Sequence, residues 1–175
     1  LQTFCSEDLG GFYLDILKDR LYTTAPKSAA RRSAQSALWH ITQAFVRLLA
    51  PITSFTAEEV WGVLTGKADD SIMFQLWHDL PELAGEGELL AKWSLIRAAR
   101  ADVTKALEAQ REAGKIGSAL QAAVEVRCAG DKFDALSSLG DDLKFIFIVS
   151  AARVVRDDNE QVEATPQEHA KCERC

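Results

Sequence analysis

The stretch "SAARRSAQSALWHITQAFVRLLAP", residues 28–51, has the pattern that decides the fold class. Alanine and larger apolar residues recur every three or four positions, as one buried face of a helix requires. The stripe consists of Ala30, Ala34, Ala37, Ile41, Phe45 and Leu48. At about 100° per residue, the opposite side holds Arg32, Ser36, Trp39, Gln43 and Arg47. We predict a long helix that begins near Ser28 and ends at Pro51. Trp39 on its polar side either packs against a second neighbour or offers a surface on which a base can stack.

The segments on both sides of this helix also have helical periodicity. We predict a helix in "EDLGGFYLDILKDRLYT", residues 7–23, and another that starts at "TAEEVW" and ends at Gly66. Thr56 and Glu59 are spaced as a capping box, which makes Thr56 the expected N-cap. After a short extended segment and turn, "SIMFQLWHDLPEL", a long helix is expected from about Glu88 to Ala113. We therefore predict that residues 1–115 form an antiparallel helical bundle.

The pattern changes after Gly114 and Gly117, which interrupt the helical period. "AAVEVRC" alternates as a strand does, with Val124 and Val126 on one face. A short helix is expected in "DKFDALSSLGDDL", and one or two strands in "KFIFIVSAARVV". The sequence thus predicts a mainly α fold, a helical bundle followed by a small α+β subdomain at residues 116–156. The polar residues 157–175 are expected to form a poorly ordered tail.

Composition narrows the class of protein. The chain has 175 residues, is 47% hydrophobic and carries a formal net charge of −6, which argues against a general polyanion binder. A positive excess is confined to residues 1–50, where a local basic face could still bind RNA. We expect no membrane span and no signal peptide, and the start at Leu1 rather than methionine suggests a piece of a longer protein. Four irregularly spaced cysteines favour a reducing, cytoplasmic setting.

No catalytic constellation is evident in the sequence. The three histidines, His40, His78 and His169, are far apart, and no phosphate-binding glycine loop or nucleophile motif is present. Cys5 and Cys128 are expected to be small buried hydrophobes. The final residues "KCERC" carry a Cys-x-x-Cys pair, Cys172 and Cys175, which matches half of a tetrahedral zinc site better than a redox pair.

Several stretches together resemble bacterial isoleucyl-tRNA synthetases. They are "FYLDILKDRLYT", "RRSAQSALWHI", "LAPITSFTAEEVW", "VTKALEAQREAGKIGSALQAAVEV" and "KCERC", in the family's order and approximate spacing. The family's "IGSSLEAKV" reads "IGSALQAAV" here, so Ala119, Gln121 and Ala123 depart from it. The resemblance covers essentially the whole chain and implies the anticodon-binding helical domain of a class I synthetase, with the start of a zinc-binding C-terminus.

What the resemblance implies about activity concerns the parent enzyme. The parent would charge tRNA(Ile) with isoleucine through an adenylate made from ATP, with magnesium, and would bind zinc at its C-terminal end. This chain would itself be non-catalytic and hold no cofactor, with Cys172 and Cys175 as an empty half site. Its partners would be the anticodon stem-loop of tRNA(Ile) and the catalytic domain of the same polypeptide, and we expect a monomer.

Anticodon recognition needs cations for the phosphates and exposed surfaces for unpaired bases. The cationic candidates are Lys27, Arg31 and Arg32 near the start of the long helix, together with Arg111 and Lys115. Trp39 and Trp77 are the candidates for stacking, although Trp77 could instead close the end of the bundle. Trp61 and Trp93 are expected in the core.

Two other interpretations of the chain remain open. The first is the anticodon-binding domain of a sister enzyme, most plausibly the valyl one. The second is a helical protein-interaction scaffold without an RNA role, which the acidic net charge favours and the face containing Arg31, Arg32 and Trp39 opposes.

Overall fold

The computed structural model describes residues 1–67 and 69–167. The chain divides into two compact units, Leu1–Leu83 and a second unit that starts at Ala84. Most of the chain is helical and the only strands among the described residues belong to one small sheet, so the mainly α prediction is confirmed. The division between the units differs from the boundary after residue 115 that we predicted.

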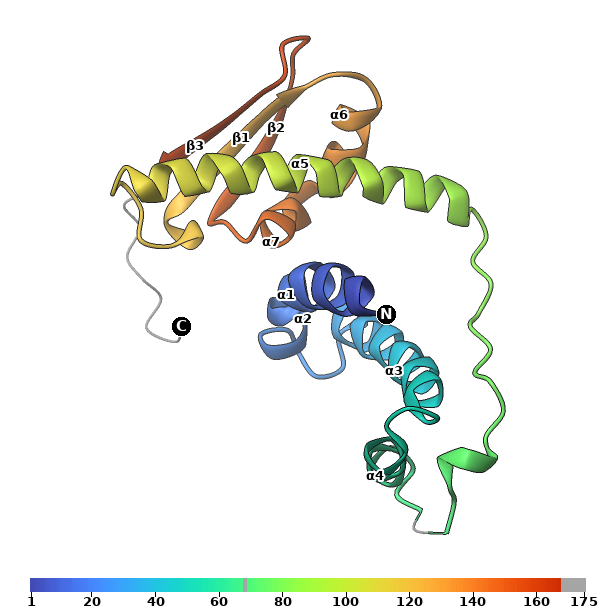
Figure 1. Ribbon diagram of the computed structural model, residues 1–175. Helices are drawn as coiled ribbons and strands as arrows, with labels where there is room; N and C mark the ends of the chain where they lie inside the picture. The colour runs from blue at the N-terminus through green and yellow to red at the C-terminus, as the bar shows by residue number, and fades with distance from the viewer. Residues whose placement is uncertain (68, 168–175) are drawn as a thin grey trace. The chain divides into compact units, whose positions relative to one another are not determined.

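The first unit is entirely helical in its regular structure (Figure 1). Its elements are a π-helix at Phe4–Tyr13, α1 at Leu14–Ile16, α2 at Lys18–Tyr22, α3 at Ala29–Leu49, α4 at Ser54–Thr65 and a 3₁₀ turn at Ile72–Phe74. Gly10 and Gly11 make the wide turns of the π-helix possible. A Cβ on Gly10 would lie 2.9 Å from the carbonyl oxygen of Cys5, which is closer than side chains tolerate.

The predicted limits of α3 are confirmed. The Ser28 side chain accepts a hydrogen bond from the Arg31 amide at 3.3 Å and caps the helix, which ends at Leu49 just before Pro51. Its buried face differs from the predicted stripe, because Gln43, which we placed on the polar side, is only 6% exposed. Since α3 contacts α2, α4 and the 3₁₀ turn at Ile72–Phe74, a single apolar stripe does not describe its burial.

The core of the first unit lies between α3, α4 and the 3₁₀ turn. One cluster of buried residues there consists of Val46, Ala50, Ala57, Trp61 and Ile72. The predicted start of α4 is wrong: the helix begins at Ser54, with Thr53 rather than Thr56 as N-cap. The predicted end is confirmed, because Gly66 adopts the left-handed conformation (φ 67°) that favours glycine.

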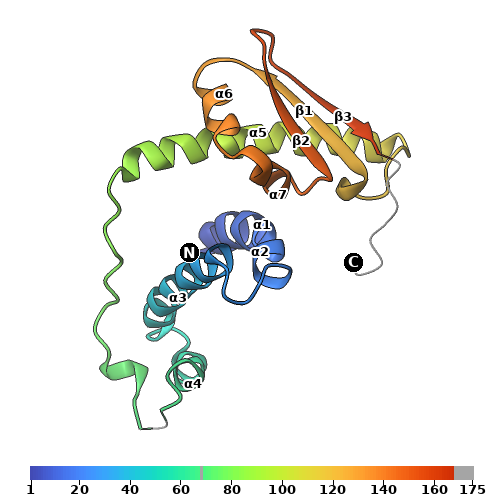
Figure 2. The ribbon, with the colours of Figure 1, turned by 180° about the vertical axis from the view of Figure 1, so that it is seen from behind.

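The second unit packs helices against a three-stranded sheet. Its elements are α5 at Glu86–Glu112, a 3₁₀ turn at Ala119–Gln121, β1 at Ala122–Cys128, α6 at Gly130–Ser137, a 3₁₀ turn at Gly140–Asp142, α7 at Leu143–Phe147, β2 at Ala151–Arg156 and β3 at Gln161–Pro166. The strand order is β2-β1-β3, with β1 parallel to β2 and antiparallel to β3. Figure 2 shows the strands in front of α5, which therefore lies along one face of the sheet.

Alternation along β1 separates the two faces of this sheet. Ala122, Val124, Val126 and Cys128 are buried, whereas the residues between them are half-buried on the other face. The predicted strand is thus confirmed, as is the burial of Cys128. The facing surface of α5 contributes Ile96, Ala99, Val103 and Leu107, all buried. Because α5 contacts the sheet, α6 and α7, it belongs to the second unit.

One prediction about the second unit is confirmed only in part, and another is wrong. Of the one or two strands expected in residues 144–155, β2 is present, whereas Leu143–Phe147 form α7. Gln161–Pro166 form β3 inside the stretch that we expected to be a poorly ordered tail. Phe147, Ile146 and Leu143 are apolar enough for either structure, and a short apolar run does not distinguish a buried helix from a strand. β3 is polar because its outer face is exposed, while Ala164 on its inner face is buried.

Candidate nucleic-acid interface

The start of α3 carries three of the predicted cations. Lys27 and Arg32 are exposed, and neither has a side-chain ion pair or hydrogen bond within the described residues. Arg31 is half-buried and donates from Nη1 to the carbonyl oxygen of Thr24 at 3.2 Å. The structure thus leaves Lys27 and Arg32 open to an anion, whereas Arg31 supports the turn that precedes the helix.

The two tryptophans proposed for stacking are both exposed. Trp39 on α3 is 50% exposed and Trp77, beyond the 3₁₀ turn, is 71% exposed. The alternative in which Trp77 closes the end of the bundle is therefore wrong. Trp61 is 4% exposed, which confirms its predicted place in the core, and Trp93 is half-buried.

Two histidines that we treated as isolated meet beside these tryptophans. His40 Nδ1 and His78 Nε2 are 2.9 Å apart, although the residues are 38 positions apart in the chain. Trp39 contacts both rings edge-on, with centroid distances of 4.8 Å to His40 and 5.3 Å to His78. No sequence signal points to this pair, because only the fold brings the segment after α4 back to α3.

Arg47 makes a second attachment between α3 and the same segment. Its Nε donates to the carbonyl oxygen of Leu76 at 2.7 Å, and its Nη1 donates to both oxygens of Gln43 at 2.7 Å. Its guanidinium also lies 4.7 Å from the ring centre of Trp61. Trp77 is thus flanked by two anchored residues, Leu76 and His78.

Arg111 and Lys115, the remaining cationic candidates, belong to the second unit. Arg111 forms an ion pair with Glu108 one turn earlier on α5. Lys115 is exposed and follows Gly114, whose φ of 68° ends the helix. The ion pair makes Arg111 the less available of the two for a phosphate.

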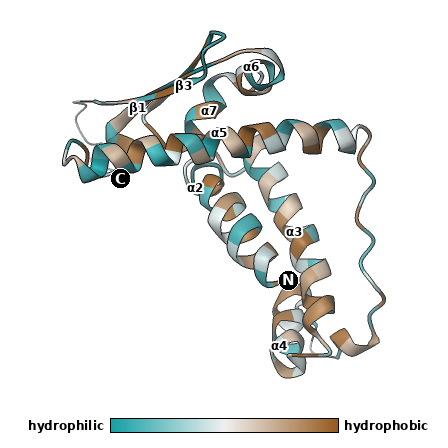
Figure 3. Cartoon of the chain, turned by 45° about the horizontal axis from the view of Figure 1, so that its top comes forward, coloured by the Kyte–Doolittle hydropathy of each residue, from teal (hydrophilic) through white to brown (hydrophobic). Residues whose placement is uncertain are grey.

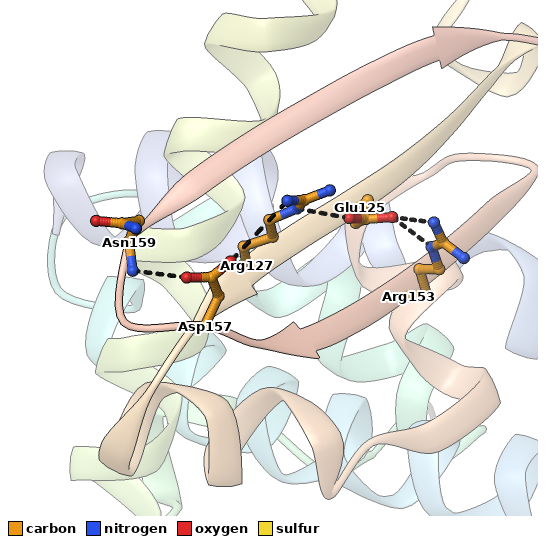
Figure 4. A network of polar contacts seen from close by, with 5 residues as sticks. All are labelled: Glu125, Arg127, Arg153, Asp157 and Asn159. Atoms are coloured by element: carbon orange, nitrogen blue, oxygen red, sulfur yellow. Dashed lines mark hydrogen bonds and ion pairs between the residues drawn. The ribbon is translucent and has the colours of Figure 1, made fainter.

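A charged ladder crosses the outer face of the sheet in the second unit (Figure 4). The Glu125 carboxylate accepts from Arg127 Nε at 2.8 Å and also pairs with Arg153 on β2. Arg127 lies 3.9 Å from Asp157 as well. The hydrogen bonds from Arg127 and then Arg153 hold the pKa of Glu125 below its usual value. Sequence reasoning missed this network, because its members come from two separate segments, β1 and residues 153–157.

The metal prediction falls on Cys172 and Cys175, which lie outside the described residues. Within residues 1–67 and 69–167, no three histidine, cysteine or carboxylate side chains gather as a metal site would require. Burial raises the pKa of the Cys128 thiol, which suits an inert core residue. Among the described helices, none is long and apolar enough to cross a membrane.

Comparison with known families identifies the helical part of the chain. A family model described as the anticodon-binding domain of tRNA ligase matches residues 1–126. The chain belongs to this anticodon-binding family. The match covers all of the first unit together with α5 and most of β1, so the predicted relationship to class I synthetases is confirmed.

The relatives of this anticodon-binding domain show to which tRNA ligases it is similar. The chain is 86% identical over its whole length to an isoleucine–tRNA ligase of Dechloromonas aromatica (strain RCB), of which it covers 19%. It is 60% identical to isoleucine–tRNA ligase 1 of Burkholderia mallei (strain ATCC 23344) and 57% identical to an isoleucine–tRNA ligase of Aromatoleum aromaticum, again with 19% of each covered. The chain thus spans about a fifth of the length of these relatives and corresponds to their anticodon-binding region, as the isoleucyl interpretation predicts.

Proposed function

We propose that this chain binds the anticodon stem-loop of tRNA(Ile) as part of an isoleucine–tRNA ligase. The observation that carries the proposal is the exposure of Trp39 and Trp77, at 50% and 71%, on a domain of the anticodon-binding family. Exposed indole rings stack on unpaired bases of any identity. Lys27 and Arg32, which precede Trp39 in the sequence, supply positive charge for the phosphates. Because the net charge of the chain is −6, the contact with RNA must use a local group of basic side chains.

The chemistry of the ligase belongs to the rest of the parent polypeptide. Its relatives are named as ligases that join isoleucine to tRNA, a reaction that uses ATP with magnesium, and we propose the same activity for the parent of this chain. The chain itself would position the tRNA and contact the catalytic domain. We also propose that the parent is a cytoplasmic monomer. The predicted domain boundary after residue 115, between a helical bundle and an α+β subdomain, stays a prediction about the parent.

Zinc in the parent remains part of the proposal. Cys172 and Cys175 would supply two thiolate ligands, and a structural zinc site needs four. We propose that the other two ligands come from the rest of the parent polypeptide; within the described residues, no three histidine, cysteine or carboxylate side chains gather as a metal site would require. We derive no step of anticodon binding through this metal.

Titration of the chain with an anticodon stem-loop of tRNA(Ile) at low salt tests the proposal. We expect saturable binding, followed by amide and indole N–H shifts, that is stronger than binding to a non-cognate stem-loop. Trp77→Ala should weaken the affinity about 5- to 100-fold, as expected for losing one base stack. Lys67→Ala, which removes an exposed lysine after α4, is the matched control and should bind as the wild type does.

Failure has a definite meaning in this experiment. Absence of shifts with either stem-loop would favour the scaffold interpretation, in which the helical domain contacts protein rather than RNA. Equal binding of both stem-loops with no effect of Trp77→Ala would reduce the interaction to general attraction between charges.

A further inference from the structure

The geometry of the His40–His78 pair identifies it as a hydrogen bond. The ring centroids are 5.2 Å apart and the facing nitrogens 2.9 Å apart. The difference is about two ring radii, so each nitrogen points directly at the other. In a pair of metal ligands both nitrogens would instead point at a common third atom. The two rings are therefore joined to each other, one as donor and one as acceptor.

Such a bond requires at least one neutral ring. A doubly protonated pair has two donors and no acceptor, and places two positive charges side by side. Two charged groups act on His78. Arg47 on α3 disfavours a positive charge on the ring, and Asp79 favours it. Burial, followed by His40 and Arg47, holds the pKa of His78 below its usual value of 6.5. The bond is thus intact at neutral pH and is lost in acid.

The bond lies next to both exposed tryptophans. Trp77 directly precedes His78, and on its other side the Leu76 carbonyl is held by Arg47. His40 and Arg47 are seven residues apart on α3 and so project from the same face of the helix. Trp39 packs edge-on against both histidine rings. Loss of the His40–His78 bond would release one of the two anchors of Trp77 and the ring contacts of Trp39 together.

We propose that His40 and His78 are positioning residues, a latch that holds Trp39 and Trp77 in the arrangement that receives unpaired bases and that opens when both rings are protonated. The role of the latch in receiving bases rests on the proposed anticodon binding. The latch itself is a property of the protein alone, so the two can be tested separately.

The test uses two substitutions of His78. His78→Gln introduces an amide that can either donate to neutral His40 or accept from protonated His40, so that the link survives at every pH. His78→Phe keeps a ring but abolishes the hydrogen bond. Circular dichroism and thermal melting first establish that each variant folds.

Measurements without RNA test the latch. In the wild type the indole N–H resonances of Trp39 and Trp77 should move with the titration of His78, whose pKa lies below 6.5. In His78→Gln they should stay constant, and in His78→Phe they should resemble the acid form at every pH. Indole resonances of the wild type that do not follow the histidine titration would overturn the latch, whether or not the chain binds RNA.

Measurements with the tRNA(Ile) stem-loop test its purpose. Between pH 7.5 and a pH on the acid side of the His78 titration, the wild type should lose about two- to tenfold in affinity, as expected for one hydrogen bond. His78→Gln should keep its affinity over this range, and His78→Phe should be weak at both pH values. Wild-type affinity in His78→Phe at pH 7.5 would overturn the positioning role, whereas no binding by the wild type at all would contradict the proposed function.

Discussion

Arg47 shows how one side chain can join several parts of the first unit. Its guanidinium donates to both oxygens of Gln43 and to the Leu76 carbonyl, and lies over the ring of Trp61. Gln43 is 6% exposed, so its side-chain oxygen depends on this donor. A buried polar atom without a partner costs more than the hydrogen bond that satisfied it contributes.

We predict that Arg47→Met destabilises the first unit by about 1–3 kcal/mol, because it removes the donor and leaves the Gln43 oxygen unsatisfied. Urea unfolding followed by tryptophan fluorescence measures the change. Arg32→Met, at an exposed position of the same helix, is the control and should change stability by less than about 0.5 kcal/mol. An equal change in the free energy of unfolding for the two substitutions would mean that the contacts of Arg47 do not stabilise the first unit.

Glu125 provides a test of electrostatics in the second unit. Its folded-state pKa lies below the ordinary value of 4.5, so the carboxylate stabilises the fold fully above that value. The stabilisation is lost as the pH falls through the lowered folded-state pKa, because the unfolded chain then binds more protons. We predict that Glu125→Gln reduces the decline in stability below about pH 4.5. Glu112→Gln, at the exposed end of α5, should keep the wild-type decline in denaturant unfolding measured from pH 6 to 3.

At the scale of elements, the second unit depends on strands that come from separate parts of the chain. β1 is the central strand, and β3 pairs with it in antiparallel register, with Ala164 opposite Val124. Both of these residues are buried on the face that the helices cover, whereas Thr165 points to the other face. One strand therefore offers two neighbouring positions with opposite environments.

We predict that Ala164→Asp destabilises the second unit by several kcal/mol, about 3 or more, because it buries a carboxylate without a partner. Thr165→Asp introduces the same side chain one residue later on the exposed face and should cost less than about 1 kcal/mol. Thermal unfolding monitored by circular dichroism distinguishes the two. Similar losses in both variants would contradict the assignment of β3 to the sheet.

The cap before β1 shows how an element tolerates a departure from the family pattern. Gln121 stands where the resemblance leads one to expect a carboxylate. Its side-chain oxygen accepts from the amides of Gly117 at 2.7 Å and Ser118 at 3.1 Å. A neutral amide oxygen performs the same capping as a carboxylate oxygen here, with a weaker, uncharged hydrogen bond.

Across the whole molecule, apolar and charged surfaces are unevenly distributed. Figure 3 shows hydrophobic ribbon along much of α4, where Phe55 and Val63 are 92% and 82% exposed. The chain has 26 acidic and 20 basic side chains, so positive potential can only be local. Any RNA contact must therefore rely on a few cations. The dependence of the affinity on salt concentration measures how many cations contact phosphates.

We predict that the logarithm of the stem-loop affinity falls with the logarithm of salt concentration with a slope between about −1.4 and −2.1, as two or three phosphate contacts to a single strand require. Lys27→Ala and Arg32→Ala should each reduce the slope by about 0.7. Lys67→Ala should leave it unchanged. A slope that neither substitution alters would place the phosphates elsewhere on the chain, with Lys115 as the next candidate.

Much of the local structure was determined by the sequence by itself. Ser28 and Pro51 bracket α3, Gly66 ends α4, and the alternation of Ala122–Cys128 makes β1, because caps, breakers and periodicity act between residues that are close in the chain. The motifs around these elements were also sufficient to predict the family. Exposure of Trp39 was left open, and the tertiary structure resolved it.

Only the tertiary structure decided which distant residues meet. The His40–His78 bond, the hydrogen bond from Arg47 to the Leu76 carbonyl and the pairing of β3 with β1 all join segments whose separate patterns say nothing of each other. β3 is polar along its exposed face, and its hydrogen bonds come from the backbone, which every sequence possesses. Periodicity reports that a face is buried, but the identity of the covering partner depends on how the whole chain packs.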